Sequence, residues 1–273
     1  MNERKLDHRR KYYMILDCET ATLPFIGEYS AEVRKKIAIA KPLIYDFGYQ
    51  IIDNKGKVYR KRSFVISEIF SVPSIFNTAY YASKRPIYIE RLKKGETILK
   101  SWNEATAIFE KDLQEVFAVG AYNSMFDFKK AIPFTERYIK ALYSDNYADF
   151  EQKQKFACDK IAQGKEYKND NFDEQHFIFR GKKYKMFDLW GLSCEHLLNN
   201  DEYKNLCKAN EWFSPSKKYF STNAERTFAY ITKNHDFEEA HTAIDDAEIE
   251  SIIFEKIVKK SKNNYIILKG EYK

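Results

Sequence analysis

Apolar residues gather in three short runs near the start of the chain, at residues 12–16, 43–52 and 58–66. These runs are rich in Tyr, Ile, Val and Phe, which are residue types favoured in β-strands. The second and third runs flank residues 53–57, which read Asp-Asn-Lys-Gly-Lys. Two apolar runs around such a turn sequence predict a β-hairpin. The beginning of the chain is therefore expected to form a three-stranded meander.

Helical spacing of apolar residues dominates most of the remaining chain. Ser30 precedes a predicted helix over residues 31–38 that ends near Pro42, and a longer helix is predicted from Asn103, leading into a short strand at residues 119–122. The later predicted elements are a helix opening after Asn123, a hairpin over 176–188 turning at Arg180-Gly181-Lys182, a helix through Leu197, a capping box at Thr222-Asn223-Ala224-Glu225 and a final helix over 242–259. Residues 67–100 show no clean period, and residues 143–173 are polar and read as an insertion. Strands come first and helices follow, which predicts a fold that contains both strands and helices.

Composition agrees with a folded chain. Of the 273 residues, 44% are hydrophobic and 32% are charged, which excludes a disordered or collagen-like protein and a disulfide-stapled miniprotein. No run approaches the roughly 18 apolar residues of a spanning helix. We expect no secretory signal and no membrane association, hence a cytoplasmic protein.

The four cysteines give no metal or redox motif. Cys18, Cys158, Cys194 and Cys207 lie far apart, and no pair has C-x-x-C spacing. Cys194, His196 and Cys207 could be imagined as zinc ligands, but Cys194 and His196 lie within an amphipathic apolar pattern that explains them better. Reduced thiols are expected.

The net charge of +6 is small, yet the basic residues are clustered. Residues 57–62 and 180–185 interleave Lys and Arg with Tyr, and a third cluster covers residues 84–94. Such a mixture suits phosphate contacts combined with base stacking. Taken alone, the clusters are better explained as solvated hairpin tips.

A few acidic residues stand where elements of the fold begin or end. Asp17 and Glu19 follow the first apolar run, and because side chains alternate along a strand they share one face. Asp127 follows the short strand and Asn123. His241 and Asp246 introduce the last helix; on one continuous helix they would lie about 140° apart, so His241 is expected on the preceding loop. Each acid alone is explained by solvation or capping, and only their joint occurrence indicates a cleft.

Three motifs in this set resemble the exonuclease motifs of the DEDD superfamily. They are Asp17-Cys18-Glu19-Thr20, Tyr122-Asn123-Ser124-Met125-Phe126-Asp127 and His241-Thr242-Ala243-Ile244-Asp245-Asp246-Ala247. His241 stands five positions before Asp246, as in the DEDDh branch, whereas a tyrosine-type member would have Tyr at the position of Thr242. The chain is also similar to exonucleases encoded by phages of low-GC bacteria.

The resemblance implies a function and a role for each residue. It implies an α/β fold with a ribonuclease H-like mixed sheet flanked by helices, in a single domain of residues 1–273 with insertions at about 21–42 and 143–173. Metal ligands for two Mg²⁺ or Mn²⁺ would be Asp17, Glu19, Asp127 and Asp246, with His241 as general base. Thr20, Ala21 and Asn123 would contact substrate or support its site. The choice of Asp246 over Asp245 rests on motif register alone.

The implied activity is a 3′–5′ exonuclease acting on single-stranded nucleic acid, DNA favoured over RNA, and releasing nucleoside 5′-monophosphates. Hard divalent cations prefer carboxylate oxygens, which fits an acidic ligand set. Two alternatives stay open: a noncatalytic nucleic-acid-binding or partner-inhibiting protein on the same scaffold, and a structure-selective endonuclease. A polymerase partner and a homodimer are equally open. Tyr122 replaces a His found in many relatives, which bears on substrate preference.

Overall fold

The computed structural model describes residues 6–7, 9–165 and 175–261. The strands are β1 (Tyr12–Ala21), β2 (Leu43–Asp53), β3 (Val58–Ile66), β4 (Ile98–Lys100), β5 (Ala118–Ala121), β6 (His176–Phe179) and β7 (Lys182–Asp188). The α-helices are α1 (Ala31–Ala40), α2 (Ser67–Phe70), α3 (Pro73–Phe76), α4 (Arg85–Lys94), α5 (Trp102–Leu113), α6 (Ser124–Phe126), α7 (Ile132–Leu142), α8 (Tyr147–Ala162), α9 (Leu189–Ser193), α10 (Asp201–Ala209), α11 (Ala224–Thr232) and α12 (Ala243–Lys260). Two 3-10 turns, η1 (Pro24–Glu28) and η2 (Ala82–Lys84), and two π-helical turns, η3 (Asp127–Ala131) and η4 (Cys194–Leu198), complete the described elements.

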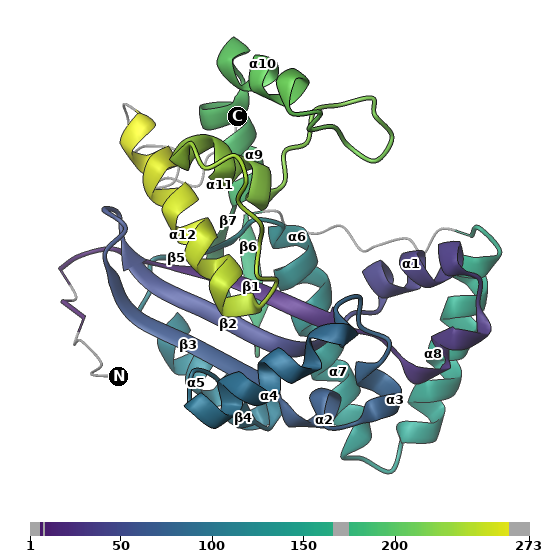
Figure 1. Ribbon diagram of the computed structural model, residues 1–273. Helices are drawn as coiled ribbons and strands as arrows, with labels where there is room; N and C mark the ends of the chain where they lie inside the picture. Colours follow the sequence, from purple (N-terminus) through teal and green to yellow (C-terminus); the bar gives the residue numbers. More distant parts are fainter. Residues whose placement is uncertain (1–5, 8, 166–174, 262–273) are drawn as a thin grey trace.

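The strands form a seven-stranded mixed sheet in the order β4-β3-β2-β1-β5-β7-β6. β1, β2 and β3 are the predicted antiparallel meander, while β5 runs parallel to β1 and β7 runs parallel to β5. Helices cover both faces, and Figure 1 shows α12 lying across β1 and β2. The predicted α/β class, a mixed sheet flanked by helices, is thus confirmed, and the strand order is consistent with the expected ribonuclease H-like sheet.

Two apolar cores hold the helices on the sheet, one on each face. The alternation of β1 sends Met14 and Leu16 to the face covered by Trp102 and Phe109 of α5. It sends Tyr13 and Ile15 to the opposite face, under the apolar side of α12. Because side chains two residues apart along a strand point to the same face, residues 17 and 19 face α12, as residues 13 and 15 do.

Most predicted elements form, but two stretches and one helix cap differ from the prediction. The polar stretch at 143–173 contains α8, which the sequence did not predict because few of its side chains, among them Ala157 and Cys158, are buried; residues 166–173 lie outside the described residues. Residues 67–100 contain three- and four-residue turns, α4 and the edge strand β4, pieces mostly too short to show a period.

The capping-box prediction at Thr222 is wrong by one residue. Asn223 is the N-cap of α11, and its side-chain oxygen accepts the N–H of Arg226 at 3.0 Å. Thr222 Oγ1 instead accepts the indole N–H of Trp190. Among the described residues, no helix combines the length and apolarity needed to cross a membrane.

Candidate active site

β1 presents Asp17 and Glu19 on the face that α12 covers. Cys18, between them, points into the opposite core, as the strand alternation predicted. In the antiparallel register Asp17 lies opposite Gly48 of β2, and Glu19 lies opposite Asp46. Residues directly opposite in an antiparallel pair share a face. Asp46 is therefore a third strand carboxylate beside Asp17 and Glu19.

The absence of a side chain at Gly48 lets α12 reach the sheet next to these acids. A Cβ at residue 48 would lie 2.4 Å from the backbone nitrogen of Ile244. The N–H of Ala243 donates a hydrogen bond to Asp46 Oδ2 at 2.8 Å, and the Tyr88 hydroxyl donates to the same oxygen at 2.9 Å. The first turn of α12 is thus fixed on β2, directly above the strand acids.

Asp245 and Asp246 point to different partners. The Asp245 carboxylate accepts hydrogen bonds from Arg91 at 2.6 Å and from the Thr242 hydroxyl at 2.7 Å. Burial opposes ionisation of Asp245, but these bonds outweigh it and lower its pKa. Asp246 is 8% exposed and lies with Glu19 and His241, whose ligand atoms and its own are all within 4.8 Å of one another.

His241 lies on the loop before α12, with Thr242 as the N-cap of the helix. The residue adopts a left-handed backbone conformation with φ 52°. Its Nδ1 lies 3.6 Å from Glu239 Oε2. Burial, followed by the charge of Lys84, lowers the pKa of His241 below 6.5, while Glu225 acts in the opposite direction. The imidazole is therefore predominantly neutral at pH 7.

Asp127 comes from the other side of β1, at the beginning of η3 beyond the end of β5. It is 3% exposed, and its N–H donates to the carbonyl oxygen of Asn123 at 3.1 Å. Burial raises its pKa strongly, although a hydrogen bond with the Cys18 thiol opposes the shift. Asp127 also raises the pKa of Asp17, so the two carboxylates act on each other.

Burial, and after it the neighbouring carboxylates, raises the pKa of Asp17, Glu19 and Asp246. Burial is the largest cause throughout; for Asp17 the charges of Asp127, Asp46 and Glu239 follow, and for Glu19 those of Asp17, Asp246 and Asp46. The pKa of Asp246 rises to about 9, because Asp17 and Glu239 add to its burial. Without a cation, burial and the neighbouring charges therefore favour the protonated, uncharged form of these groups.

Two further acids belong to this group and were missed from the sequence. The pKa of Asp46 rises to about 6, mainly through burial. Glu250 is 2% exposed, accepts the N–H of Tyr122 at 3.1 Å, and its pKa is raised by burial and then by Asp17, Asp127 and Asp246. Glu250 follows Asp246 by four residues, the spacing that puts two side chains on one helix face, so the pattern was present in the sequence. Asp46 carried no comparable signal, because its place depends on the β1–β2 register.

The three residues expected to contact substrate are placed differently. Thr20 is partly exposed and follows an irregularity in the β1–β2 register between Glu19 and Thr20. Ala21 is 3% exposed and packs in the core, so its side chain is closed to a nucleotide. The side chain of Asn123 is exposed and does not cap α6; its link to Asp127 runs through its carbonyl oxygen.

The donor set fits a divalent cation. Glu19, Asp246 and His241 offer two hard oxygen donors and a neutral nitrogen at close range. Asp246 Oδ1 is buried and has no hydrogen-bond partner among the described residues. A buried carboxylate oxygen is costly unless hydrogen bonds or a cation compensate it. Among the described residues, Asp17 and Asp127 are not part of this group of three. Asp127 raises the pKa of Asp17, and Asp17 raises the pKa of Glu19, so their charges still act on the group.

The basic clusters at 57–62 and 180–185 are largely used in internal ion pairs. Arg60 binds Asp112 and Glu115, each at 2.6 Å, and Arg180 lies 3.3 Å from Glu136. Lys182 pairs with Glu110. The cluster at 84–94 is different, since Lys84 lowers the pKa of Glu19 and of His241 and thus lies beside the site.

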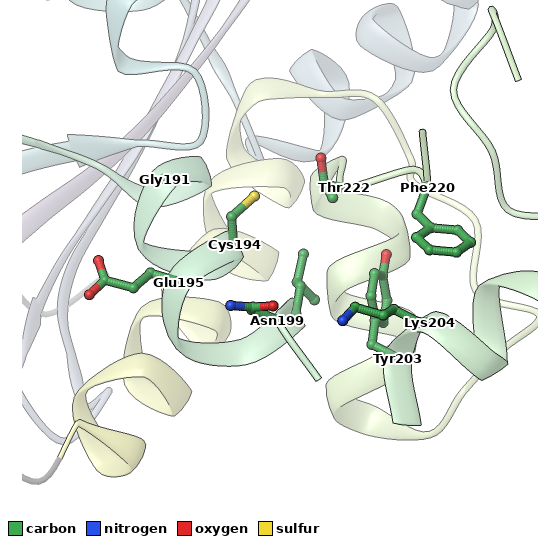
Figure 2. Close-up of a pocket in the computed structure, with 9 residues that line it drawn as sticks. Gly191, Cys194, Glu195, Asn199, Tyr203, Lys204, Phe220 and Thr222 are labelled. Atoms are coloured by element: carbon green, nitrogen blue, oxygen red, sulfur yellow. The ribbon is translucent and has the colours of Figure 1, made fainter. Parts of the chain in front are cut away.

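A cavity of about 480 Å³ opens between α9, η4, α10 and the chain before α11. Figure 2 shows the side chains of Cys194, Asn199, Lys204 and Phe220 around it. None of the predicted site residues lines it. Tyr122 connects the wall of this cavity to one of the acids. Its hydroxyl donates a hydrogen bond to the carbonyl oxygen of Thr222 at 2.7 Å, and its backbone N–H donates to Glu250.

Comparison with known proteins gives little. No family model matches the chain. No curated protein sequence matches it. A crystal structure of cell-death related nuclease 4 (CRN-4) is similar at a TM-score of 0.41 and 10% sequence identity, covering 94% of this chain and 67% of the other. A likeness at this TM-score and identity does not establish a function for this chain.

Proposed function

We propose that the chain is a metal-dependent 3′–5′ exonuclease of the DEDDh type, which hydrolyses terminal phosphodiesters of single-stranded nucleic acid, DNA in preference to RNA, to nucleoside 5′-monophosphates. The observation that carries the proposal is the grouping of Glu19, His241 and Asp246 within 4.8 Å, from two segments more than 200 residues apart in the sequence. The motif resemblance requires these three residues to lie close together. A purely structural role does not explain why two carboxylates and an imidazole gather at one place.

The orientation of the two consecutive aspartates supports the same register. Asp245 is satisfied by Arg91 and Thr242, whereas Asp246 faces the other acids with an unpaired buried oxygen. A chain that merely stabilised its fold would lose little by replacing Asp246 with an apolar residue. Retention of repelling carboxylates is better explained by a ligand that neutralises them.

Asp17, Glu19, Asp127 and Asp246 would hold two Mg²⁺ or Mn²⁺. Bound divalent cations supply a nucleophile at neutral pH and neutralise the charge that develops on the leaving oxygen. Asp46 would have a structural role. It accepts a hydrogen bond from the Ala243 N–H, which holds the first turn of α12 and thereby fixes the position of Asp246. Glu250 ties the same helix to Tyr122 at the end of β5.

His241 would take the proton from the attacking water. Its lowered pKa keeps the ring unprotonated at neutral pH, as a general base requires. Since Nδ1 lies near Glu239 Oε2, we assign the proton-accepting role to Nε2. His241 could instead serve as a third metal ligand beside Glu19 and Asp246, and substitution of His241 separates the two roles because a ligand affects metal affinity and a base does not.

The substrate is inferred from the charge around the site. A phosphodiester approaching a group of carboxylates is repelled, so cations must hold the strand. Lys84, beside Glu19 and His241, is suited to contact a phosphate near the terminal bond. Affinity should fall as salt rises, because phosphate contacts release counterions.

End-labelled oligonucleotides test the proposal and its rivals. With Mg²⁺ or Mn²⁺, a single strand labelled at its 5′ end should shorten stepwise from the 3′ end, with DNA degraded faster than RNA. Internal cuts would indicate the structure-selective endonuclease. Binding without any cleavage, with either metal and on single-stranded or duplex DNA and RNA, would indicate the noncatalytic protein.

The single-domain organisation with insertions at about 21–42 and 143–173 stays a prediction.

A further inference from the structure

The segment from Asn77 to Lys84, here called the bridging segment, lies between β1 and the loop that carries His241. At one end, Thr78 Oγ1 accepts the N–H of Thr22 at 2.8 Å and donates to its carbonyl oxygen at 3.0 Å. At the other end, Lys84 Nζ donates to the carbonyl oxygen of Ala240. The bridging segment therefore joins the residue just past β1 to the residue just before His241.

Within this segment, Tyr81 stacks on the His241 imidazole. The ring centroids are 4.3 Å apart and the rings are inclined by 14°. Lys84 Nζ lies 4.9 Å from the Tyr81 ring centroid, and Tyr80 packs edge-to-face on Tyr81 at 4.8 Å. Tyr81 is thus held in place by its own neighbours while its flat face meets the histidine.

The histidine needs such support because of its backbone. A residue with a side chain populates left-handed φ values unfavourably, and it stays there only when the surroundings fix it. Among the described residues, no hydrogen bond from the His241 side chain is found; its polar neighbours are carboxylates, with Glu239 Oε2 at 3.6 Å from Nδ1 and Glu225, Glu19 and Asp246 within 4.8 Å. The stack with Tyr81 restricts the ring. The loop is held by the bond from Lys84 to Ala240, together with the bond from the Glu239 N–H to Glu225 at 3.3 Å.

The chain after the bridging segment is itself rigidly placed. The Arg85 guanidinium carbon lies 4.8 Å from the ring centroid of Phe70 and 5.0 Å from that of Phe76, and both phenylalanines are in the core. The position of Tyr81 is therefore set by the fold and not by the loop it contacts.

We propose that Tyr81 is a positioning residue, which holds the His241 ring toward Glu19 and Asp246 by stacking, with Lys84 fixing the loop behind it. This inference rests on the proposed function, in which His241 accepts a proton. The aromatic ring performs the task and the phenol hydroxyl is dispensable. Loss of the ring should then lower the rate of the chemical step and leave substrate and metal binding intact.

The kinetic test compares Tyr81→Phe with Tyr81→Leu and Tyr81→Gln, two nonaromatic variants of which one suffices if the other does not fold. Tyr81→Leu should lower kcat about 10- to 100-fold with KM changed less than about twofold, because a base displaced by a fraction of an ångström to an ångström loses this much. Tyr81→Phe should keep most of kcat. Tyr219→Leu, which removes an exposed tyrosine of another loop, is the matched control.

A double-mutant cycle shows whether Tyr81 acts through His241. In a His241→Ala background, measured under single-turnover conditions, Tyr81→Leu should cause no further loss. An equal loss in both backgrounds would overturn the inference, as would a Tyr81→Phe defect as large as that of Tyr81→Leu. A raised KM with unchanged kcat would do so too, by assigning Tyr81 to substrate contact.

A measurement without substrate or metal separates this inference from the proposed function. The chain has five histidines, so the His241 imidazole C–H signals can be assigned by NMR with the His241→Ala variant. Stacking on Tyr81 should shift these signals upfield, and Tyr81→Leu should remove the shift while Tyr81→Phe keeps it. An inactive wild-type protein that retains the shift would refute the nuclease alone, whereas identical signals in all variants would refute the stack.

Discussion

The backbone nitrogen of Ile244 lies directly over Gly48, with no room for a side chain between them. A Cβ at residue 48 would approach that nitrogen to 2.4 Å, and the obstacle is backbone of α12 and not a flexible side chain. Because this turn of α12 carries Asp246, the contact links the packing of the helix to the geometry of the acids. The glycine therefore bears on function as well as on stability.

Gly48→Ala should lower the free energy of unfolding by about 2–3 kcal/mol, since overpacking a fixed contact forces α12 away from β2. It should also reduce nuclease activity more than the stability loss explains at a temperature where the variant is folded. Thermal unfolding and the end-labelled assay measure the two effects. Gly27→Ala is the control: nothing lies within 4 Å of its added Cβ, so a change within about 0.5 kcal/mol is expected.

Asp245→Asn and Asp246→Asn should have opposite effects on activity and on stability. Asp246→Asn should abolish measurable cleavage and leave the fold intact or more stable, because it removes one repelling charge. Asp245→Asn weakens the ion pair with Arg91 and should cost stability, about 1 kcal/mol or somewhat more, while activity is retained. If Asp245→Asn is the inactive variant, the register chosen for the third motif is wrong.

Magnesium or manganese should raise the melting temperature, and Asp17→Asn should shrink that rise. Two carboxylates ~5 Å apart at an effective dielectric constant of ~20 repel by about 3 kcal/mol, and a bound cation relieves this repulsion. Differential scanning fluorimetry with and without chelator gives the shift. Equal shifts in the wild type and in Asp17→Asn would contradict the assignment of Asp17 as a ligand.

In chelator, the protein should lose stability as the pH rises. The pKa of Asp246 is raised from 3.8 to about 9, so the folded state keeps a proton that the unfolded chain releases. This contribution is fully present below pH 3.8 and is lost as the pH passes through about 9. The raised pKa values of Asp17, Glu19, Asp127 and Glu250 act in the same direction.

Melting temperatures in chelator at about pH 5 and about pH 9 check this dependence. Asp246→Asn should flatten it, because an amide does not titrate. Excess magnesium should flatten it as well, by favouring the ionised carboxylates. A wild-type stability that increases over this range would show that the acids are not crowded as described.

His241→Ala should lower the rate about 100-fold or more, the usual contribution of a general base. The magnesium-induced rise in melting temperature should persist, since the carboxylates remain. The rate of the wild type should rise with pH through a value below 6.5 and then level off, because the pKa of His241 is lowered. Loss of the magnesium effect in His241→Ala would instead identify His241 as a ligand.

The sequence predicted those parts of the fold that depend on local pattern. The meander, α5, α12 and the hairpin of β6 and β7 have clear periods or turn residues; at the β6–β7 turn, Arg180 and Gly181 both have the positive φ that such a two-residue turn needs. α8 was missed because its buried side is narrow, and residues 67–100 because their elements are short.

Site residues that belong to a sequence motif could be predicted, whereas residues that only folding brings to the site were missed. Asp17 and Glu19 follow from strand alternation, and the loop position of His241 from the angle to Asp246. Asp46 and Tyr81 could not be found in this way. Their roles depend on strand register and on a segment without periodicity, and both come from contacts across long separations in sequence.

The order of the site residues along the chain has a consequence during protein synthesis. Asp17, Glu19 and Asp46 are translated early, but Glu19 gains His241 and Asp246 as neighbours only once α12 has left the ribosome and docked against Gly48. An unfinished polypeptide thus carries strand acids with no assembled centre. The proposed activity therefore requires that the last helix has docked on the sheet.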